Sequence, residues 1–331
     1  MPSPSATLID DGIFRILVCR TSHSLGNTLF ITPLLQELEQ HWPGAEVDVV
    51  TRYASTRQVF SSYATIRDLF VLPKNAFRKP LEWLGTLWRL RRKRYDLVID
   101  ADLRSRTGRQ LVRFARGRHK LGFAPRGGVT VAVDLSNAPS HAAHFPVFLL
   151  RSALGKLDRE YPPLSIQLKP AERRGGGRRL LQVMGDKPPA CGVIGIFANA
   201  TGPKAMAPEW WSGFMREAES HLSGYAIVEI IPAFGRSMLE DRYPAYYSSD
   251  IRHLSRLLSS LDLLISLDCG IMHLARASGT PVGAVFTATD VDIWGPYGRG
   301  SFVVKGNPNR PKAAAQALLD GIPIARAPAA A

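Results

Sequence analysis

Residues 262–298 read DLLISLDCGIMHLARASGTPVGAVFTATDVDIWGPYG, and this stretch decides the fold. It opens with an apolar run at 263–267 and a short polar turn at 268–270. Apolar residues then recur with helical spacing over 271–278, and a second apolar run occupies 282–286. This order predicts a strand, a tight turn, a helix and a second strand that lies parallel to the first.

The turn is the expected working surface of this unit. Ligands of parallel α/β sheets bind beyond the carboxyl ends of the strands. The first turn of a helix adds N–H groups and a partial positive charge, both of which suit a phosphate. Asp268, Cys269 and Gly270 form the turn, and His273 lies one turn into the helix, where apolar residues flank it. We therefore expect His273 to face the ligand, with a core position as the alternative.

The same alternation of apolar runs and helix-like segments fills both halves of the chain. Further strands are expected at 14–19, 46–51, 69–72, 95–100, 191–197, 225–231 and 302–304. Strands that alternate with helices predict a parallel sheet covered on both faces. The fold class is therefore α/β, with two doubly wound, Rossmann-like domains facing a cleft.

A glycine-rich segment suggests where the two domains meet. The sequence AERRGGGRR at 171–179 places three glycines between arginine pairs, which is typical of a flexible connection. We expect an N-terminal domain at 1–170, a linker at 171–185 and a C-terminal domain at 186–331. A last helix is expected at 312–320, with packing toward the N-terminal domain as an option.

Composition restricts the class of protein. The chain has 331 residues, 45% of them hydrophobic, which fits two globular domains. Its three cysteines form no CxxC pair, so neither a zinc site nor a disulfide framework is indicated. No signal peptide and no apolar run of about 20 residues is seen, which argues against a membrane span. We expect a cytoplasmic protein without a bound metal or cofactor.

Positive charge is concentrated in the first half. The net charge is +14, and the window 74–126 holds sixteen Lys or Arg against four acidic residues, an excess of +12. Such a field attracts a polyanion: nucleic acid, an anionic membrane or a phosphorylated glycolipid. Ordinary solubilising charge is the alternative. Nucleic acid is disfavoured, because the aromatic residues are not interleaved with the arginines as a stacking platform requires.

One segment of this window has the pattern of a basic amphipathic helix. The sequence PLEWLGTLWRLRR at 80–92 places Leu81, Leu84, Leu87, Trp88 and Leu90 near one face and gathers arginines toward the end. A helix of this kind can lie on a membrane surface. The alternative is a helix packed on its own sheet, with cations at its C-terminal end, where the helix dipole favours them.

Three stretches together resemble glycosyltransferase family nine, the heptosyltransferases of the lipopolysaccharide inner core. The first is LGNTLFITPLLQELEQHWPGAEVDVVT at 25–51, similar to that family's opening loop, helix and second strand. The second is YDLVIDADLRSRTGRQLVRFARGRHKLGF at 95–123. The third is the stretch 262–298, which resembles the family's Asp-Ser/Thr-Gly-x-x-His-Leu-Ala helix and its Trp-Gly-Pro-Tyr-Gly loop.

The resemblance implies a GT-B fold and an inverting, metal-independent sugar transfer. The donor would be ADP-heptose or another nucleoside diphosphate sugar, held mainly by the C-terminal domain. The acceptor would be an anionic glycolipid, reached by peripheral contact with the inner membrane. Such chemistry needs a base for the acceptor hydroxyl and cations or helix N–H groups for the leaving diphosphate.

On the donor side, the resemblance assigns Lys204 to the leaving diphosphate and residues 268–270 with His273 to the phosphate-binding turn. A solvated loop lysine is the alternative for Lys204. The remaining predicted donor-side residues are Gly26, Thr201 and Ser237. Two positions depart from the family: Cys269 replaces Ser or Thr, and Ser237 stands where an acidic residue usually holds the ribose. The second departure leaves the identity of the donor open.

The base side departs further. The family's opening loop carries Gly-Asp, with the Asp as the proposed general base, whereas this chain has Gly26 followed by Asn27. An amide cannot take a proton from a hydroxyl, so Asn27 can only orient it. Asp102 and His23 are the candidate bases. A catalytically impaired protein that binds nucleotide sugar or glycolipid without turnover is the alternative function. Predicted acceptor contacts are Arg104 and Arg106, just beyond the strand at 95–100.

Overall fold

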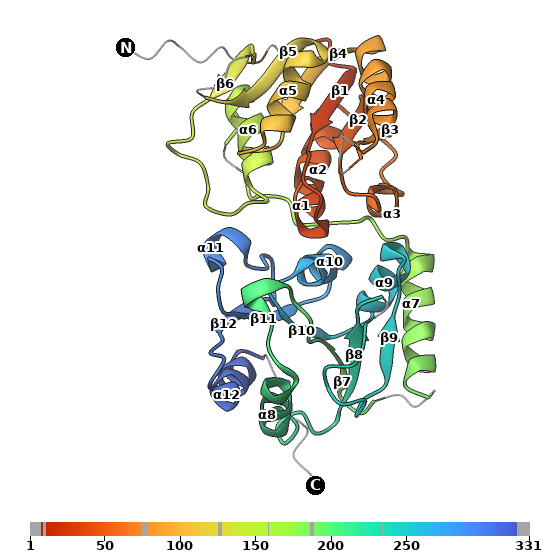
Figure 1. Cartoon of the computed structure of the whole chain (residues 1–331), viewed down its shortest axis with the longest axis vertical. Helices are drawn as coiled ribbons and strands as arrows, with labels where there is room; N and C mark the ends of the chain where they lie inside the picture. Colours follow the sequence, from red (N-terminus) through yellow and green to blue (C-terminus); the bar gives the residue numbers. More distant parts are fainter. Residues whose placement is uncertain are drawn as a thin grey trace. The chain divides into compact units, whose positions relative to one another are not determined.

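The computed structural model describes residues 8, 11–73, 78–124, 128–157, 159–185, 189–233 and 235–322. The tail beyond 322 and most of the first ten residues lie outside this range. The chain divides into two compact units, Met1–Ile166 and Gln167–Ala331. Each unit is an α/β sandwich built on one six-stranded sheet, and Figure 1 shows the two sheets with their helices.

The N-terminal unit contains a fully parallel sheet. Its strand order is β3-β2-β1-β4-β5-β6. The strands are β1 (Arg15–Cys19), β2 (Glu46–Thr51), β3 (Ile66–Val71), β4 (Arg94–Asp100), β5 (Arg116–Phe123) and β6 (Val131–Val133). The two central strands, β1 and β4, are almost entirely buried, as continuous apolar runs in a covered parallel sheet should be.

Six helices in the described part of the N-terminal unit cover this sheet. They are α1 (Leu25–Leu29), α2 (Thr32–His41), α3 (Thr56–Phe60), α4 (Pro80–Arg92), α5 (Arg106–Phe114) and α6 (Phe145–Leu154). Helices α2 and α6 pack against each other, whereas α4 and α5 contribute to a separate core cluster with β1 and β4. Helix α6 ends at Gly155, whose φ of 66° is the left-handed conformation that glycine adopts readily.

The C-terminal unit repeats this plan. Its parallel sheet has the order β12-β11-β10-β7-β8-β9. The strands are β7 (Gly192–Phe197), β8 (Tyr225–Ile231), β9 (Ala245–Tyr247), β10 (Leu263–Leu267), β11 (Val282–Phe286) and β12 (Phe302–Lys305). The helices are α7 (Pro170–Val183), α8 (Pro208–Ala218), α9 (Ile251–Leu258), α10 (Gly270–Ser278), α11 (Val291–Trp294) and α12 (Pro311–Gly321), with the 3-10 turn η1 (Gly202–Lys204). The order of strand, turn, helix and strand predicted at 262–298 is confirmed as β10, α10 and β11.

The predicted linker at 171–185 is wrong, because α7 occupies most of it. The glycines of this segment serve close packing. A Cβ built on Gly176 would lie 1.9 Å from the carbonyl oxygen of Arg256 in α9, so only glycine fits. Glu172 at the start of α7 adds ion pairs to Arg252 and Arg256 at 2.6 and 2.9 Å. These contacts fix α7 to α9 within the C-terminal unit.

Packing of the last helix toward the N-terminal domain stays a prediction. In the structure, α12 packs on α8, β11 and β12 of its own unit. Its small and apolar residues Ala314, Ala315 and Leu318 are buried in the same core cluster as the aromatic residues of α8. Apolar spacing alone showed that this helix has a buried face, but not which surface covers it.

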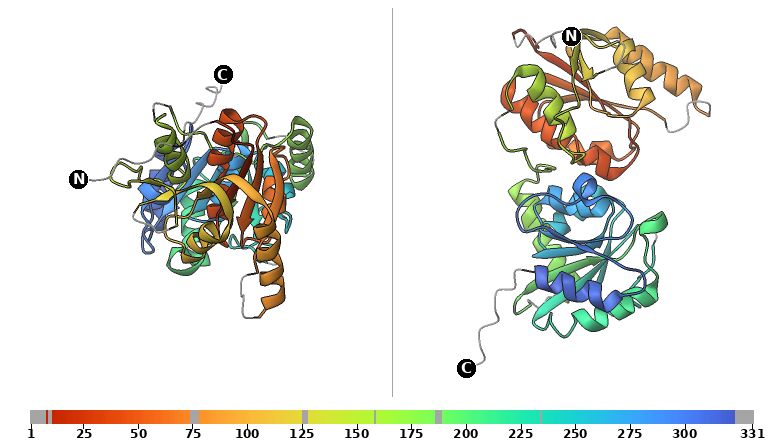
Figure 2. Two further views of the ribbon diagram at one scale, coloured as in Figure 1. Left: turned by 90° about the horizontal axis from the view of Figure 1, so that it is seen from above. Right: turned by 90° about the vertical axis from the view of Figure 1, so that its left-hand side faces the viewer.

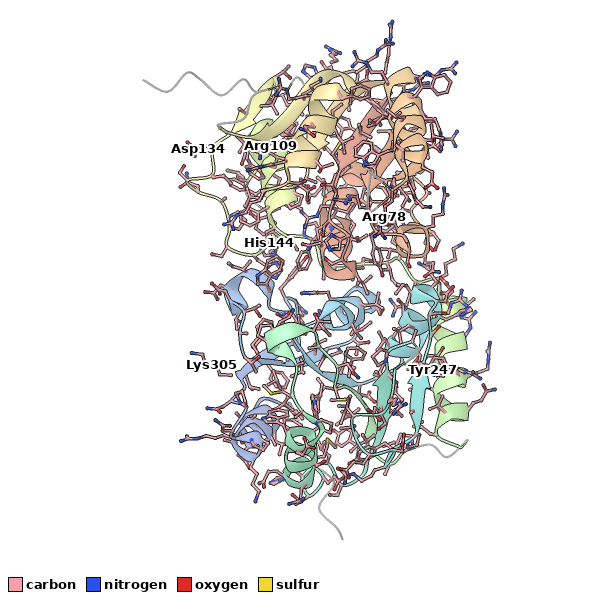
Figure 3. All side chains as sticks on the ribbon, in the orientation of Figure 1. Arg78, Arg109, Asp134, His144, Tyr247 and Lys305 are labelled. Carbon is pink, nitrogen blue, oxygen red and sulfur yellow. The ribbon has the colours of Figure 1, made fainter. Side chains whose placement is uncertain are left out.

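His144 in the N-terminal unit predicts how the free energy of unfolding changes with pH. It stacks on Tyr161 with ring centroids 4.1 Å apart, and Figure 3 labels its position. Burial, with the charges of His141 and Arg151, lowers its pKa from 6.5 to about 4. Between pH 6.5 and 4, His144 therefore binds a proton in the unfolded chain but stays neutral in the folded chain. We expect the free energy of unfolding to fall by about 1–2 kcal/mol as the pH drops through this window, discounted for partial exposure.

The measurement is denaturant unfolding at several pH values. Replacing His144→Phe keeps an aromatic ring for Tyr161 and removes the proton, so the fall between pH 6.5 and 4 should diminish. The exposed His23→Phe variant is the matched control and should keep the fall. An unchanged pH profile in the His144→Phe protein would assign the effect to another group.

Candidate functional site

In the C-terminal unit, the sheet has its topological switch point between β7 and β10. The chain leaves β7 for β8 on one side and later returns to form β10 on the other side. Ligands of open α/β sheets bind beyond the carboxyl ends of the strands at such a point. The loop after β7 contains Thr201 and Lys204, and the turn after β10 contains Asp268, Cys269 and Gly270. The predicted donor-side residues on these two loops therefore lie at neighbouring strand ends.

Lys204 and Asp268 form the charged centre of this edge. The Nζ of Lys204 lies 3.3 Å from Oδ2 of Asp268, and the Asp268 side chain is only 7% exposed. The Thr289 hydroxyl donates to the same carboxylate oxygen at 2.5 Å. The ammonium is thus held over the strand ends by a buried carboxylate, while about a quarter of the lysine side chain stays exposed (26%). This arrangement leaves a cation available to an anion at the switch point.

The helix that begins here presents its first turn to the same edge. Helix α10 starts at Gly270 after Cys269, whose Sγ lies 3.3 Å from the Ser266 hydroxyl. Burial raises the pKa of the Cys269 thiol, so it stays neutral. His273 is 4% exposed on the second turn, buried with the rest of that helix face. Its contact with a donor stays a prediction.

Ser237 lies in the turn that follows β8, and its hydroxyl is already hydrogen-bonded there. Its hydroxyl donates to Oε2 of the fully buried Glu229 at 2.6 Å. The Oγ of Ser237 itself accepts from the backbone N–H groups of Leu239 and Asp241 at 3.0 Å. With three bonds already made, this hydroxyl holds the local turn. Its predicted role in holding the ribose stays untested.

Two polar residues at this edge escaped the sequence analysis. Asn199 follows the end of β7, and Thr287 follows the end of β11. The Nδ2 of Asn199 and the Oγ1 of Thr287 are both buried and have no hydrogen-bond partner among the residues that the structure describes. Buried polar atoms are costly unless they are bonded, so these atoms are suited to a bound ligand or water. The only sequence signal was their position just beyond apolar runs.

In the N-terminal unit, the equivalent switch point lies between β1 and β4. Arg20 follows β1 directly and is 7% exposed. Its guanidinium donates to the backbone oxygens of Ala101 at 2.7 Å and Asn27 at 3.1 Å. It also donates to Oδ1 of Asn27 at 2.8 Å and lies 3.4 Å from Oδ1 of Asp102. Arg20 therefore joins the predicted base position to the candidate base Asp102, a link that the sequence analysis missed.

Asp102 is enclosed by donors. Its Oδ2 accepts from the N–H and hydroxyl of Thr21 at 2.6 and 2.7 Å, while Oδ1 faces Arg20. Both carboxylate oxygens of Asp102 are therefore already engaged by neighbouring donors. Asn27 donates from Nδ2 to the Ser24 hydroxyl at 2.9 Å. Of the three predicted base-side residues, His23 alone is exposed.

The remaining N-terminal predictions also lie at this carboxyl edge. Gly26 is buried in α1, the helix that follows the β1 loop. Arg104 and Arg106 are exposed around the start of α5, next to the loop of Asp102. Their exposure suits contact with an anionic acceptor. In the described parts of the chain, no group of three or more His, Cys, Asp or Glu is arranged to hold a metal ion.

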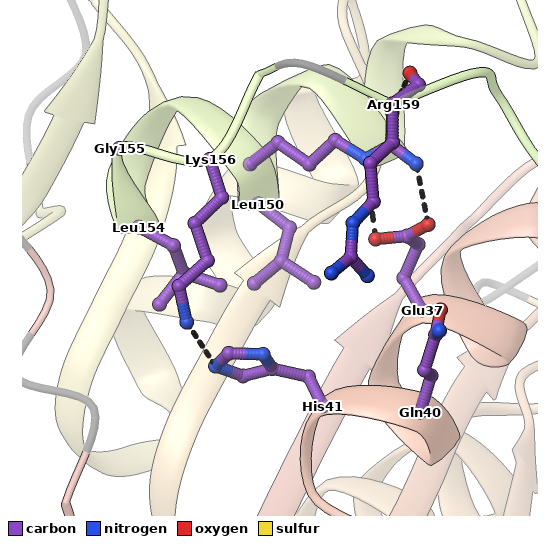
Figure 4. Close-up of a pocket in the computed structure, with 9 residues that line it drawn as sticks. Glu37, Gln40, His41, Leu150, Leu154, Gly155, Lys156 and Arg159 are labelled. Atoms are coloured by element: carbon purple, nitrogen blue, oxygen red, sulfur yellow. Dashed lines mark hydrogen bonds and ion pairs between the residues drawn. The ribbon is translucent and has the colours of Figure 1, made fainter.

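A pocket elsewhere in the N-terminal unit is separate from this edge. It measures about 590 Å³ and lies where α2 and α6 end, at the amino edge of the sheet (Figure 4). Arg151 there is bonded to both carboxylate oxygens of Glu37 at 2.6 and 3.2 Å. Lys156 lies 3.5 Å from the His41 ring. Glu37 neutralises Arg151, the lining also carries the cations Lys156 and Arg159, and none of the predicted site residues lines the pocket.

Comparisons with known proteins match this architecture. Residues 249–322 match the family model described as glycosyltransferase family 9 (heptosyltransferase). A lipopolysaccharide heptosyltransferase 1 from Escherichia coli is 23% identical over 325 residues, which cover 89% of this chain and 92% of that protein. Within the described residues, no helix is both long and apolar enough to cross a membrane.

Solved structures share the fold over nearly the whole chain. A family 9 glycosyl transferase from Veillonella parvula has a TM-score of 0.77 at 20% identity, covering 95% of this chain and 99% of that one. The E. coli heptosyltransferase WaaC with ADP has a TM-score of 0.70 at 21% identity, covering 93% and 98%. The predicted resemblance to this family and the predicted fold class are confirmed: residues 249–322 match the family 9 model, and the chain has two Rossmann-like sheets as in the GT-B fold.

Proposed function

We propose that the protein is an inverting, metal-independent glycosyltransferase that moves a heptose or a related sugar from a nucleoside diphosphate to a lipopolysaccharide-core or similar envelope glycolipid. The observation that carries the proposal is Lys204, held by the buried Asp268 at the switch point of the C-terminal sheet. A cation beside a helix N-terminus suits a diphosphate that gains charge as its bond to the sugar breaks. The relatives named above include an enzyme solved with ADP.

In this proposal the donor side stabilises the leaving group of the sugar transfer. The acceptor oxygen attacks the anomeric carbon from the face opposite the diphosphate, the bond between that carbon and the phosphate oxygen breaks, and the configuration inverts. Lys204 and the first N–H groups of α10 take up the charge of the leaving nucleoside diphosphate. Asn199 and Thr287 offer further hydrogen bonds at the same strand ends.

The acceptor side is assigned to the N-terminal unit. The window 74–126 carries the excess of +12, and Arg104 and Arg106 are exposed beside the loop of Asp102. An anionic glycolipid on the cytoplasmic face of the inner membrane fits this charge. The acceptor hydroxyl must lose a proton, and the exposed His23 is the candidate to take it, because Asn27 cannot and Asp102 is enclosed.

Two measurements test the proposal. A panel of nucleoside diphosphates should contain one that raises the melting temperature, since a ligand bound only by the folded state stabilises it. The corresponding sugar donor should then release that nucleotide in the presence of a lipopolysaccharide-core acceptor. If no nucleotide stabilises the protein and no donor is turned over, the proposal fails.

A second function, binding without turnover, is favoured by Asn27 and by the enclosed Asp102. The variant Asn27→Asp tests it. The new carboxylate can keep the bond from Arg20, and the Ser24 hydroxyl can reverse to donate. General bases contribute about 10²–10⁴ in rate, and pairing with Arg20 weakens this one. We therefore expect transfer to accelerate about 10–100-fold, measured as nucleotide release.

The control is Asn137→Asp, which makes the same charge change at an exposed loop position of the same unit. It should leave the rate unchanged. If the parent itself turns over and the Asn27→Asp protein is no faster, a base is already present, and binding without turnover loses its support. The melting-temperature shift with nucleotide should be equal in all three proteins.

A further inference from the structure

Helix α4 has two opposite apolar faces. Its inner face carries Trp83, Leu87 and Leu90, which pack on the core cluster of the N-terminal unit. Its outer face carries Leu81, Leu84 and Trp88, whose exposed fractions are 82%, 62% and 60%. With about 100° per residue, Leu84 and Trp88 lie within roughly 60° of Leu81, whereas Leu90 lies on the far side of the helix. The predicted single apolar face of this helix is therefore wrong.

The outer face is unusual for a surface helix. Single exposed apolar residues are normal and need no explanation. Among the described residues, however, nine large hydrophobic side chains are exposed, and three of them share this one helical face. The inner face already anchors α4 to the sheet, so packing within the unit gives no reason for the outer residues. A partner outside the unit would explain them.

Cations border this face at both ends. Arg78 and Lys79 precede the helix, and Arg89, Arg91, Arg92 and Arg94 lie at its end, all of them exposed. The guanidinium of Arg92 lies 4.4 Å from the centre of the Trp88 ring. Glu82 is the one acidic residue at 78–94, and it pairs with Lys79 at 2.8 Å. An apolar stripe with a border that is mainly cationic matches an anionic lipid surface, where apolar side chains enter and arginines meet phosphates.

The position of α4 allows such contact. Figure 2 shows α4 extending outward from its unit, with its first turns farthest out. These first turns follow the carboxyl end of β3, which lies at the same sheet edge as Asn27 and Asp102. A bilayer that receives the start of α4 would therefore lie near the edge assigned to the acceptor.

We propose that the outer face of α4 docks the protein on an anionic lipid bilayer. Leu81, Leu84 and Trp88 enter the boundary between headgroups and acyl chains, and the bordering arginines contact lipid phosphates. The inference deepens the proposed function, because a glycolipid acceptor is presented at such a surface. It does not require turnover, so it can be tested separately.

The test is flotation of the full chain with vesicles. One set of vesicles contains phosphatidylcholine alone, and the other also contains about 30% of the anionic lipid phosphatidylglycerol. The parent protein should bind the anionic vesicles at least about 10-fold more strongly, and added salt should weaken this binding. The double variant Leu81→Ser/Trp88→Ser removes two exposed side chains and should lose about 10-fold or more of the binding. Its melting temperature should stay near that of the parent.

The matched control is Leu181→Ser/Tyr247→Ser, which also removes two exposed apolar side chains, at 39% and 65% exposure, from the C-terminal unit. It should bind vesicles as the parent does. Equal binding by the α4 variant, or no preference for anionic lipid, would overturn the proposal. So would an α4 variant that changes only the oligomeric state, because the face would then be a contact between copies.

Turnover on a deacylated, water-soluble acceptor separates this proposal from the proposed function. The α4 variant should retain that activity while it loses vesicle binding. Vesicle binding without any turnover would support docking and contradict the proposed transferase activity. Turnover without vesicle binding would do the reverse.

Discussion

Replacing Lys204→Ala should lower kcat/KM for sugar transfer by about 100- to 1,000-fold. The ammonium lies 3.3 Å from Asp268 at the switch point and remains partly exposed. In the proposed reaction it meets a diphosphate whose charge grows as the sugar leaves, and the loss of one such preorganised group costs about 3–4 kcal/mol in the transition state. The variant also leaves the buried Asp268 carboxylate with a neutral hydrogen bond from Thr289. Initial rates of nucleotide release measure the effect.

Two further variants separate charge from packing. Lys204→Arg keeps a cation on this loop and should recover part of the rate. Lys312→Ala removes an exposed lysine from α12 in the same unit and should have no effect. Nucleotide should still raise the melting temperature of the Lys204→Ala protein, with a smaller loss of this effect than of the rate. The reason is that the lysine acts most on the charge that develops in the transition state. If Lys204→Ala kept the parent rate, the lysine would be an ordinary loop residue and the donor site would lie elsewhere.

The C-terminal unit shows what a sequence can predict well. Strand β10, the turn at 268–270 and helix α10 follow from an apolar run, polar residues and helical spacing. Carboxyl ends of neighbouring parallel strands meet at one edge, so Lys204 and Asp268 could be expected together. The ion pair between them, and the bond from Thr289, depend on rotamers that no local pattern specifies. Ser237 shows the same limit, because its bond to Glu229 crosses from a loop to a strand.

The N-terminal unit shows where local patterns fail. Arg20 directly follows the strand expected at 14–19, and its guanidinium links loops that are 81 residues apart in the chain. Strand β5 (RGRHKLGF) escaped the sequence analysis, because its first half is basic and partly exposed while only its last residues are buried. Helix α4 was predicted with its cations, but its apolar residues divide between two opposite faces. Spacing identifies a helix more reliably than it identifies the surface that covers it.

The glycines at 175–177 belong to α7, and a substitution among them gives the second large expected effect, a change in stability. Replacing Gly176→Ala should lower the free energy of unfolding of the C-terminal unit by about 1–2 kcal/mol. The added methyl would lie 1.9 Å from the carbonyl oxygen of Arg256 and 2.4 Å from its carbonyl carbon. These are backbone atoms of α9, so no side chain can turn away, and α7 must move. Overpacking of this kind costs about 1–3 kcal/mol or more, which exceeds the roughly 1 kcal/mol that alanine gains over glycine in a helix.

Gly175→Ala provides the matched control one residue earlier in α7. A Cβ built there meets no atom within 4 Å. The helix should then gain about 0.5–1 kcal/mol from the better helix former. Two neighbouring glycines of the same triplet should therefore give shifts of opposite sign in thermal or denaturant unfolding. A flexible linker predicts small and equal effects at both positions, whereas a helix fixed to α9 by Gly176 and by the ion pairs of Glu172 predicts opposite ones. Equal shifts would contradict the packing of α7 on α9.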